Sequence, residues 1–120
     1  MKKKVLIVDD SQVIARQLQK IIDESGIFEV VGHAKNGIEG IKQYSSLKPD
    51  IVCMDLMMPE MDGIQAIRML TGLDKNARIL VISSAAGVGE RVVEALRSGA
   101  KNVLTKPFDP EKVIEVMKQL

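Results

Sequence analysis

Short apolar runs, rich in β-branched residues, alternate along the chain with segments whose apolar residues recur every three or four positions. Most of the runs are continuously apolar, which is typical of strands buried on both faces of a parallel sheet. The longer segments have the spacing of amphipathic helices. The predicted strands cover 5–8, 28–34, 51–54, 78–83 and 102–105. The predicted helices cover about 11–24, 36–47, the stretch after Gly63 to about 70, 88–97, and a last segment capped by Asp109.

A predicted helix follows each predicted strand, and this alternation occurs five times with short connections. Right-handed crossovers between parallel strands place helices on both faces of a sheet. The pattern therefore predicts an α/β fold with a doubly wound, five-stranded parallel sheet. The chain has no sequence repeats, low-complexity tracts or interior linkers, so residues 1–120 are expected to form one domain.

Capping residues and apolar spacing predict where the helices end and which faces they bury. Asn36 with Glu39 three positions on is a capping-box pattern, and Ser25-Gly26 ends the first helix because glycine tolerates the left-handed conformation. The apolar face of 11–24 is predicted to carry Val13, Ile14, Leu18, Ile21 and Ile22. That of 88–97 is predicted to carry Val92, Val93 and Leu96.

Composition narrows the class of protein. With 46% hydrophobic and 28% charged residues, the chain has the composition of a folded globular protein. A formal net charge of +1 gives no reason to expect a nucleic-acid partner, and no apolar stretch approaches the roughly 20 residues of a membrane span. The single cysteine, Cys53, excludes an internal disulfide, is expected in the core, and indicates a cytoplasmic protein.

Reactive side chains stand at the ends of the predicted strands, namely Asp9-Asp10, Asp55, Ser83-Ser84 and Lys106. The carboxyl ends of parallel strands share one edge, where open α/β sheets bind ligands, so these groups should converge. Three crowded carboxylates repel one another, and a hard dication relieves that repulsion. Mg²⁺, which prefers oxygen ligands, is the expected ion, since no cluster of thiolates and imidazoles favours zinc.

These motifs, in this order and spacing, resemble those of the receiver domain of bacterial two-component response regulators, including stand-alone chemotaxis regulators. The matching segments are Asp9-Asp10, Asp55 with 58–63 after it, Ser84-Ala85, and Lys106-Pro107-Phe108. The resemblance covers essentially the whole chain. It implies a flavodoxin-like sheet with strand order 2-1-3-4-5 and a phosphorylation-activated signalling switch.

The resemblance also implies the roles of individual residues around a metal ion. Asp55 would be the nucleophile that accepts a phosphoryl group from a histidine kinase. Asp10, Asp55 and the backbone carbonyl of Met57 would ligate Mg²⁺ directly, and Asp9 would act through a bound water.

Two further residues would contact the phosphoryl group itself. By the resemblance, Lys106 would pair with its oxygens and Ser84 would donate a hydrogen bond to one of them. The residues alone leave Ser83 and Ser84 as alternatives, and the spacing from Lys106 together with Ala85 matches the family for Ser84. Met57 and Ala86 offer no side chain to orient water, so self-dephosphorylation is expected to be slow.

The output side is also implied by the resemblance. A target protein would bind the face formed by the fourth helix, the fifth strand and the fifth helix, and the domain would be a monomer or a weak dimer. Many receivers carry an aromatic residue three positions before the lysine, where this chain has Val103. A switch here would therefore rely more on Ser84 and the segment 85–89.

Three alternatives remain open from the residues. A Mg²⁺-dependent aspartyl-phosphate phosphatase of the haloacid dehalogenase type would need a second acid where Met57 stands. A purely structural module would leave the acidic, hydroxyl and lysine residues unexplained. The chain could also be a receiver cut from a longer regulator with an output domain. His33, the only histidine, lacks the surroundings of a phosphohistidine.

Overall fold

The computed structural model describes residues 2–56, 58, 61–84 and 89–120, with the backbone alone for Ser84. Its strands are β1 (Lys3–Val8), β2 (Phe28–Ala34), β3 (Ile51–Asp55), β4 (Ile79–Ser84) and β5 (Asn102–Lys106). Its helices are α1 (Gln12–Glu24), α2 (Gly37–Leu47), α3 (Gly63–Leu73), α4 (Gly89–Ser98) and α5 (Pro110–Lys118). The strict alternation of strand and helix agrees with the prediction.

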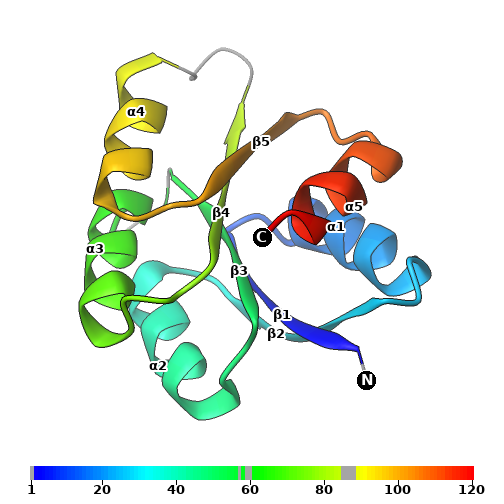
Figure 1. Ribbon diagram of the computed structural model, residues 1–120, viewed down its shortest axis with the longest axis horizontal. Helices are drawn as coiled ribbons and strands as arrows, with labels where there is room; N and C mark the ends of the chain where they lie inside the picture. The colour runs from blue at the N-terminus through cyan, green and yellow to red at the C-terminus, as the bar shows by residue number, and fades with distance from the viewer. Residues whose placement is uncertain (1, 57, 59–60, 85–88) are drawn as a thin grey trace.

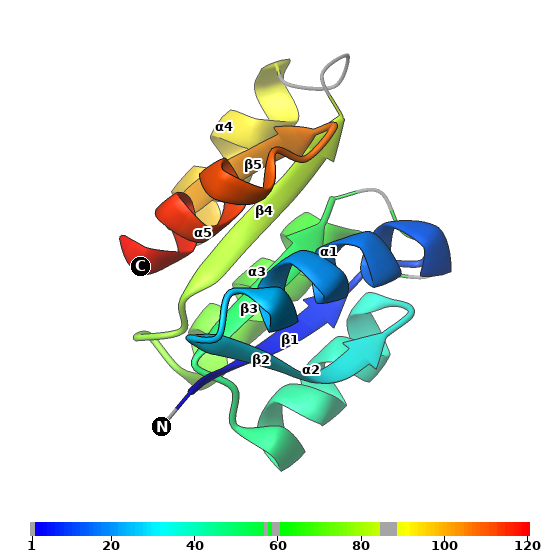
Figure 2. The same cartoon turned by 90° about the vertical axis from the view of Figure 1, so that its right-hand side faces the viewer.

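The strands form one parallel sheet in the order β2-β1-β3-β4-β5. Helices α1 and α5 cover one face, and α2, α3 and α4 cover the other (Figure 1). After a turn of 90°, α1 and α5 lie in front of the sheet (Figure 2). The predicted doubly wound fold and strand order are therefore confirmed, and all strands end at one common edge.

The continuous apolar runs of the inner strands feed two separate cores. Along β1, Val5 and Ile7 pack toward α1 and α5, whereas Leu6 and Val8 pack toward the other layer. Every residue of β3 is buried. This burial on both faces is the reason why these strands carry apolar residues at consecutive positions.

Most helix ends lie where the capping residues predicted them. The Asn36 side chain accepts a hydrogen bond from the Glu39 N–H at 2.9 Å, and Asp109 caps α5 in the same way through Glu111. Gly26, after α1, has a φ of 76°, which glycine adopts without steric cost. Each of these ends therefore has a local cause in the sequence.

Two predicted helix faces and one helix end were wrong in part. Val13, Val93 and Leu96 are 66%, 48% and 42% exposed, because α1 and α4 bury the faces that carry Ala15, Leu18 and Ile22, and Val92 and Ala95. Helix α3 runs to Leu73 instead of about 70, since Asp74 closes it by donating its N–H to the Leu70 carbonyl. None of the described helices combines the length and apolar content that crossing a bilayer requires.

The start of α3 lies directly against the end of β3. A Cβ atom added to Gly63 would lie 2.3 Å from the carbonyl oxygen of Asp55 and 2.7 Å from the Cα of Leu56. The Gly63 N–H also donates to the Leu56 carbonyl at 3.0 Å. Only glycine allows this approach, so it sets how closely α3 approaches the Asp55 strand end.

Alanine substitution at the two glycines of α3 should therefore have opposite effects. Gly63→Ala forces backbone atoms apart and should lower the free energy of unfolding by about 2 kcal/mol, within the range for overpacked sites. Gly72→Ala, where an added Cβ meets nothing within 4 Å, should raise it by about 0.5 kcal/mol through helix propensity. Urea denaturation measures both, and equal effects would contradict the close-approach argument.

Candidate functional site

The ends of β1 and β3 bring three carboxylates together. Val8 pairs with Met54 across these strands, so Asp9 and Asp55, which follow them, are neighbours. Asp9, Asp10 and Asp55 each place one carboxylate oxygen within 4.8 Å of the other two. The acidic residues expected at this edge therefore form one cluster.

Asp9 is the most deeply buried member of the cluster. It is fully buried, and burial raises the pKa of its carboxyl group. The Ser11 N–H, which donates to Asp9 Oδ1 at 2.8 Å, and the Lys106 ammonium both lower this pKa, and the charge of Asp10 raises it. A hydrogen bond with the Asp55 side chain lowers it as well. When the carboxylates are ionised, Asp9 Oδ2 is buried with no hydrogen-bond donor among the described residues. Such an oxygen has the chemistry of a cation site.

The remaining predicted residues lie at the same edge, on β4 and β5. Ser84 and Lys106 are register partners at the ends of these strands. Lys106 is half-buried at the end of β5, and its positive charge lowers the pKa of Asp9. The preceding Ser83 is buried. The side chain of Ser84 and all of Met57 lie outside the described residues.

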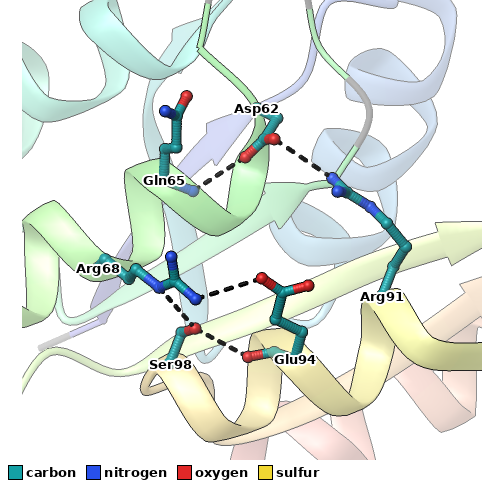
Figure 3. Close-up of polar contacts among 6 residues, drawn as sticks. All are labelled: Asp62, Gln65, Arg68, Arg91, Glu94 and Ser98. Atoms are coloured by element: carbon teal, nitrogen blue, oxygen red, sulfur yellow. Dashed lines mark hydrogen bonds and ion pairs between the residues drawn. The ribbon is translucent and has the colours of Figure 1, made fainter.

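An arginine that sequence reasoning missed ties α4 to the loop behind this site (Figure 3). Arg91 Nη2 donates to the carbonyl oxygen of Leu56 at 3.3 Å and forms an ion pair with Asp62 Oδ2 at 3.6 Å. The other oxygen of Asp62 accepts the Gln65 N–H at 2.9 Å and so caps α3. Arg91 therefore fastens α4 both to the residue after Asp55 and to the start of α3.

A second polar contact joins the same two helices farther along (Figure 3). Arg68 forms an ion pair with Glu94 at 3.2 Å and donates to the Ser98 hydroxyl at 3.2 Å. Its side chain is 59% exposed, against 41% for Arg91. The partners in each pair are far apart in the chain, so no local sequence pattern predicts either contact.

Comparison with known proteins identifies the family. The response regulator receiver domain model matches residues 5–118. The chain belongs to this family. The chemotaxis protein CheY of Thermotoga maritima is 47% identical over 120 residues, which covers 100% of this chain and 98% of that protein. CheY of Bacillus subtilis is 39% identical over 117 residues, covering 98% and 96%.

Solved receiver structures have the same fold as this receiver domain. The response regulator domain of Thermotoga maritima CheB superposes with a TM-score of 0.91 at 33% identity, covering 99% of this chain and 96% of that chain. The CheX–CheY complex of Borrelia burgdorferi with BeF3 and Mg²⁺ matches with a TM-score of 0.88 at 39% identity, covering 98% and 88%.

Membership in this family settles the class of function. The chain is a CheY-like receiver domain of a two-component system. Receiver domains are signalling switches and not classical enzymes; they take a phosphoryl group from a kinase and bind target proteins. The phosphatase and structural-module alternatives are not favoured by the matches.

The two arginines on the α3–α4 interface should differ in their effect on stability. Arg91→Met removes a partly buried ion pair and a hydrogen bond to a backbone carbonyl, and should lower the free energy of unfolding by about 1 kcal/mol. The matched change Arg68→Met removes a more exposed pair and should cost less than about 0.5 kcal/mol. Chemical denaturation of both variants tests this, and a larger loss for Arg68→Met would contradict the stated role of Arg91.

Proposed function

We propose that this receiver domain accepts a phosphoryl group on Asp55 from the phosphohistidine of a histidine kinase, and that the modified domain binds its target differently. The observation that carries the proposal is the cluster of Asp9, Asp10 and Asp55, with Lys106 close by, in a chain of the receiver family. The likeness to CheY proteins over the whole chain points to a chemotaxis pathway.

Mg²⁺ fits the residues present. All the ligand atoms offered by the cluster are oxygens, and the buried Asp9 Oδ2 has no hydrogen-bond donor within the part of the chain that the structure describes. Asp10, Asp55 and the backbone carbonyl of Met57 would hold the ion, and Asp9 would contact it through water. When bound, the ion supplies positive charge that offsets the carboxylates and the phosphoryl oxygens.

The reacting group in this proposal is the Asp55 carboxylate. One of its oxygens attacks phosphorus while the phosphorus–nitrogen bond to the kinase histidine breaks, and the bonding electron pair stays on the imidazole nitrogen. The product is an acyl phosphate on Asp55. Lys106 would offset the charge on the phosphoryl oxygens, and the Ser84 hydroxyl would donate to one of them.

The reaction is stoichiometric, with one phosphoryl group for each chain, and it is followed by slow self-dephosphorylation. Loss of the phosphoryl group requires water to attack phosphorus. Met57 and Ala86, the two positions from which side chains orient that water in the family, carry no group able to do so. The phosphorylated state should therefore decay only slowly by itself.

The face that we propose for the target comprises α4, β5 and α5. Helix α4 exposes Val93 and Leu96 on this side, which supplies apolar area for a partner. The same helix is fastened to the loop after Asp55 through Arg91. Many receivers have an aromatic residue where this chain has Val103. We therefore assign to Arg91 part of the coupling between the phosphorylation site and the target face. By linkage, if phosphorylation changes the affinity of this face for the target by some factor, the bound target changes the phosphorylation equilibrium by the same factor.

The single cysteine bears on the compartment in which the protein works. The domain would work in the cytoplasm, where its single cysteine stays reduced, as a monomer or a weak dimer. Burial raises the pKa of the Cys53 thiol to about 12, so this group takes no part in the chemistry.

Acetyl phosphate with Mg²⁺ provides a direct test, read by intact-protein mass spectrometry. The protein should gain the mass of one phosphoryl group, and Asp55→Asn should gain none. The matched control is Asp50→Asn, an exposed position immediately before the start of β3, which should be modified like the unaltered protein. Modification that persists in Asp55→Asn, or that fails in the unaltered protein, would refute the proposal.

A further inference from the structure

The only histidine of the chain lies beside the acidic cluster. His33, near the end of β2, places Nε2 2.8 Å from the backbone carbonyl oxygen of Asp9. A carbonyl oxygen only accepts hydrogen bonds, so Nε2 carries the hydrogen and donates. The ring is half-buried, and the Gln43 side chain donates to the His33 carbonyl at 3.2 Å.

The end of β2 thereby holds both polar groups of the Asp9 backbone. The Asp9 N–H donates to the Ala34 carbonyl at 3.0 Å, and the Asp9 carbonyl accepts from His33. A strand partner normally supplies the second bond through its own backbone. Here the imidazole supplies it, at the position where β1 has already ended at Val8.

The carbonyl held by His33 belongs to the peptide unit that joins Asp9 to Asp10. That unit is planar, so fixing its carbonyl fixes ψ of Asp9 and φ of Asp10 together. Asp10 is exposed, and packing around its side chain therefore restricts it little. The direction of its carboxylate consequently depends on the orientation of this peptide plane.

We propose that His33 is a positioning residue of the metal site: by donating to the Asp9 carbonyl, it fixes the peptide that aims the Asp10 carboxylate at the cation. The inference rests on the proposed function, since it assumes that the acidic cluster binds Mg²⁺. Partners that orient metal ligands in this way typically change metal affinity by about 10- to 100-fold when they are removed.

Calorimetric titration with Mg²⁺ alone tests the proposal without any phosphoryl chemistry. His33→Met removes the donor and should weaken Mg²⁺ binding by about 10-fold. His33→Gln keeps an N–H donor on a side chain of similar reach and should bind within about 3-fold of the unaltered protein. The control Tyr44→Phe removes another part-buried side-chain hydrogen bond, to Asp74, and should leave the affinity unchanged.

The possible outcomes separate the two proposals. If the unaltered protein binds Mg²⁺ and His33→Met binds equally well, the inference fails while the metal site stands. Equal weakening in His33→Met and His33→Gln would also overturn it, because the hydrogen bond would then not be the cause. If the unaltered protein binds no Mg²⁺, the proposed metal site fails and the inference fails with it.

A measurement without substitutions covers the case in which His33→Met does not fold. A long-range ¹H–¹⁵N spectrum of the unaltered protein reports which ring nitrogen carries hydrogen. The proposal requires hydrogen on Nε2 both before and after Mg²⁺ is added. A bare Nε2 could not donate to the Asp9 carbonyl and would overturn the proposal.

Discussion

Repulsion between the carboxylates at the ends of β1 and β3 is the interaction on which the rest of this structure depends. Asp9 and Asp55 are buried and have oxygens within 4.8 Å of each other, so when both carboxylates are ionised, an effective dielectric constant of about 20 makes their repulsion about 3 kcal/mol. Burial also disfavours the charged form of Asp9 and raises its pKa. The Lys106 ammonium lowers this pKa, but the net shift is upward. The sheet holds negative charges together that would separate in solution, and this makes the site receptive to a dication.

Three features position the segments around this cluster. The absence of a side chain at Gly63 lets α3 begin directly against the Asp55 carbonyl. Arg91 fastens α4 to the carbonyl of Leu56. His33 holds the peptide between Asp9 and the next residue. Through α4 and Arg91, the strand end after Asp55 is connected to the surface proposed for a partner.

The layers of the fold and the acidic cluster could be predicted from sequence because their causes are local. Consecutive apolar residues mark buried strands, and residues at strand ends share one edge of a parallel sheet. The faces of α1 and α4 were partly wrong, since Val13 and Val93 fit the helical period but the sheet buries the neighbouring face. The contacts of Arg91 and His33 join residues distant along the chain, and nothing near either residue indicates its partner. Such contacts depend on how the helices and strands pack, which no local pattern contains.

The Mg²⁺ dependence of the free energy of unfolding tests most directly whether the fold holds its carboxylates in place for a cation. Urea denaturation of the unaltered protein at neutral pH and constant ionic strength would be repeated over a range of Mg²⁺ concentrations. The free energy should rise logarithmically once Mg²⁺ exceeds its dissociation constant, gaining about 2.7 kcal/mol at 100 times that constant. A free energy that stays constant, or that rises equally with a monovalent salt in place of Mg²⁺, would contradict the account.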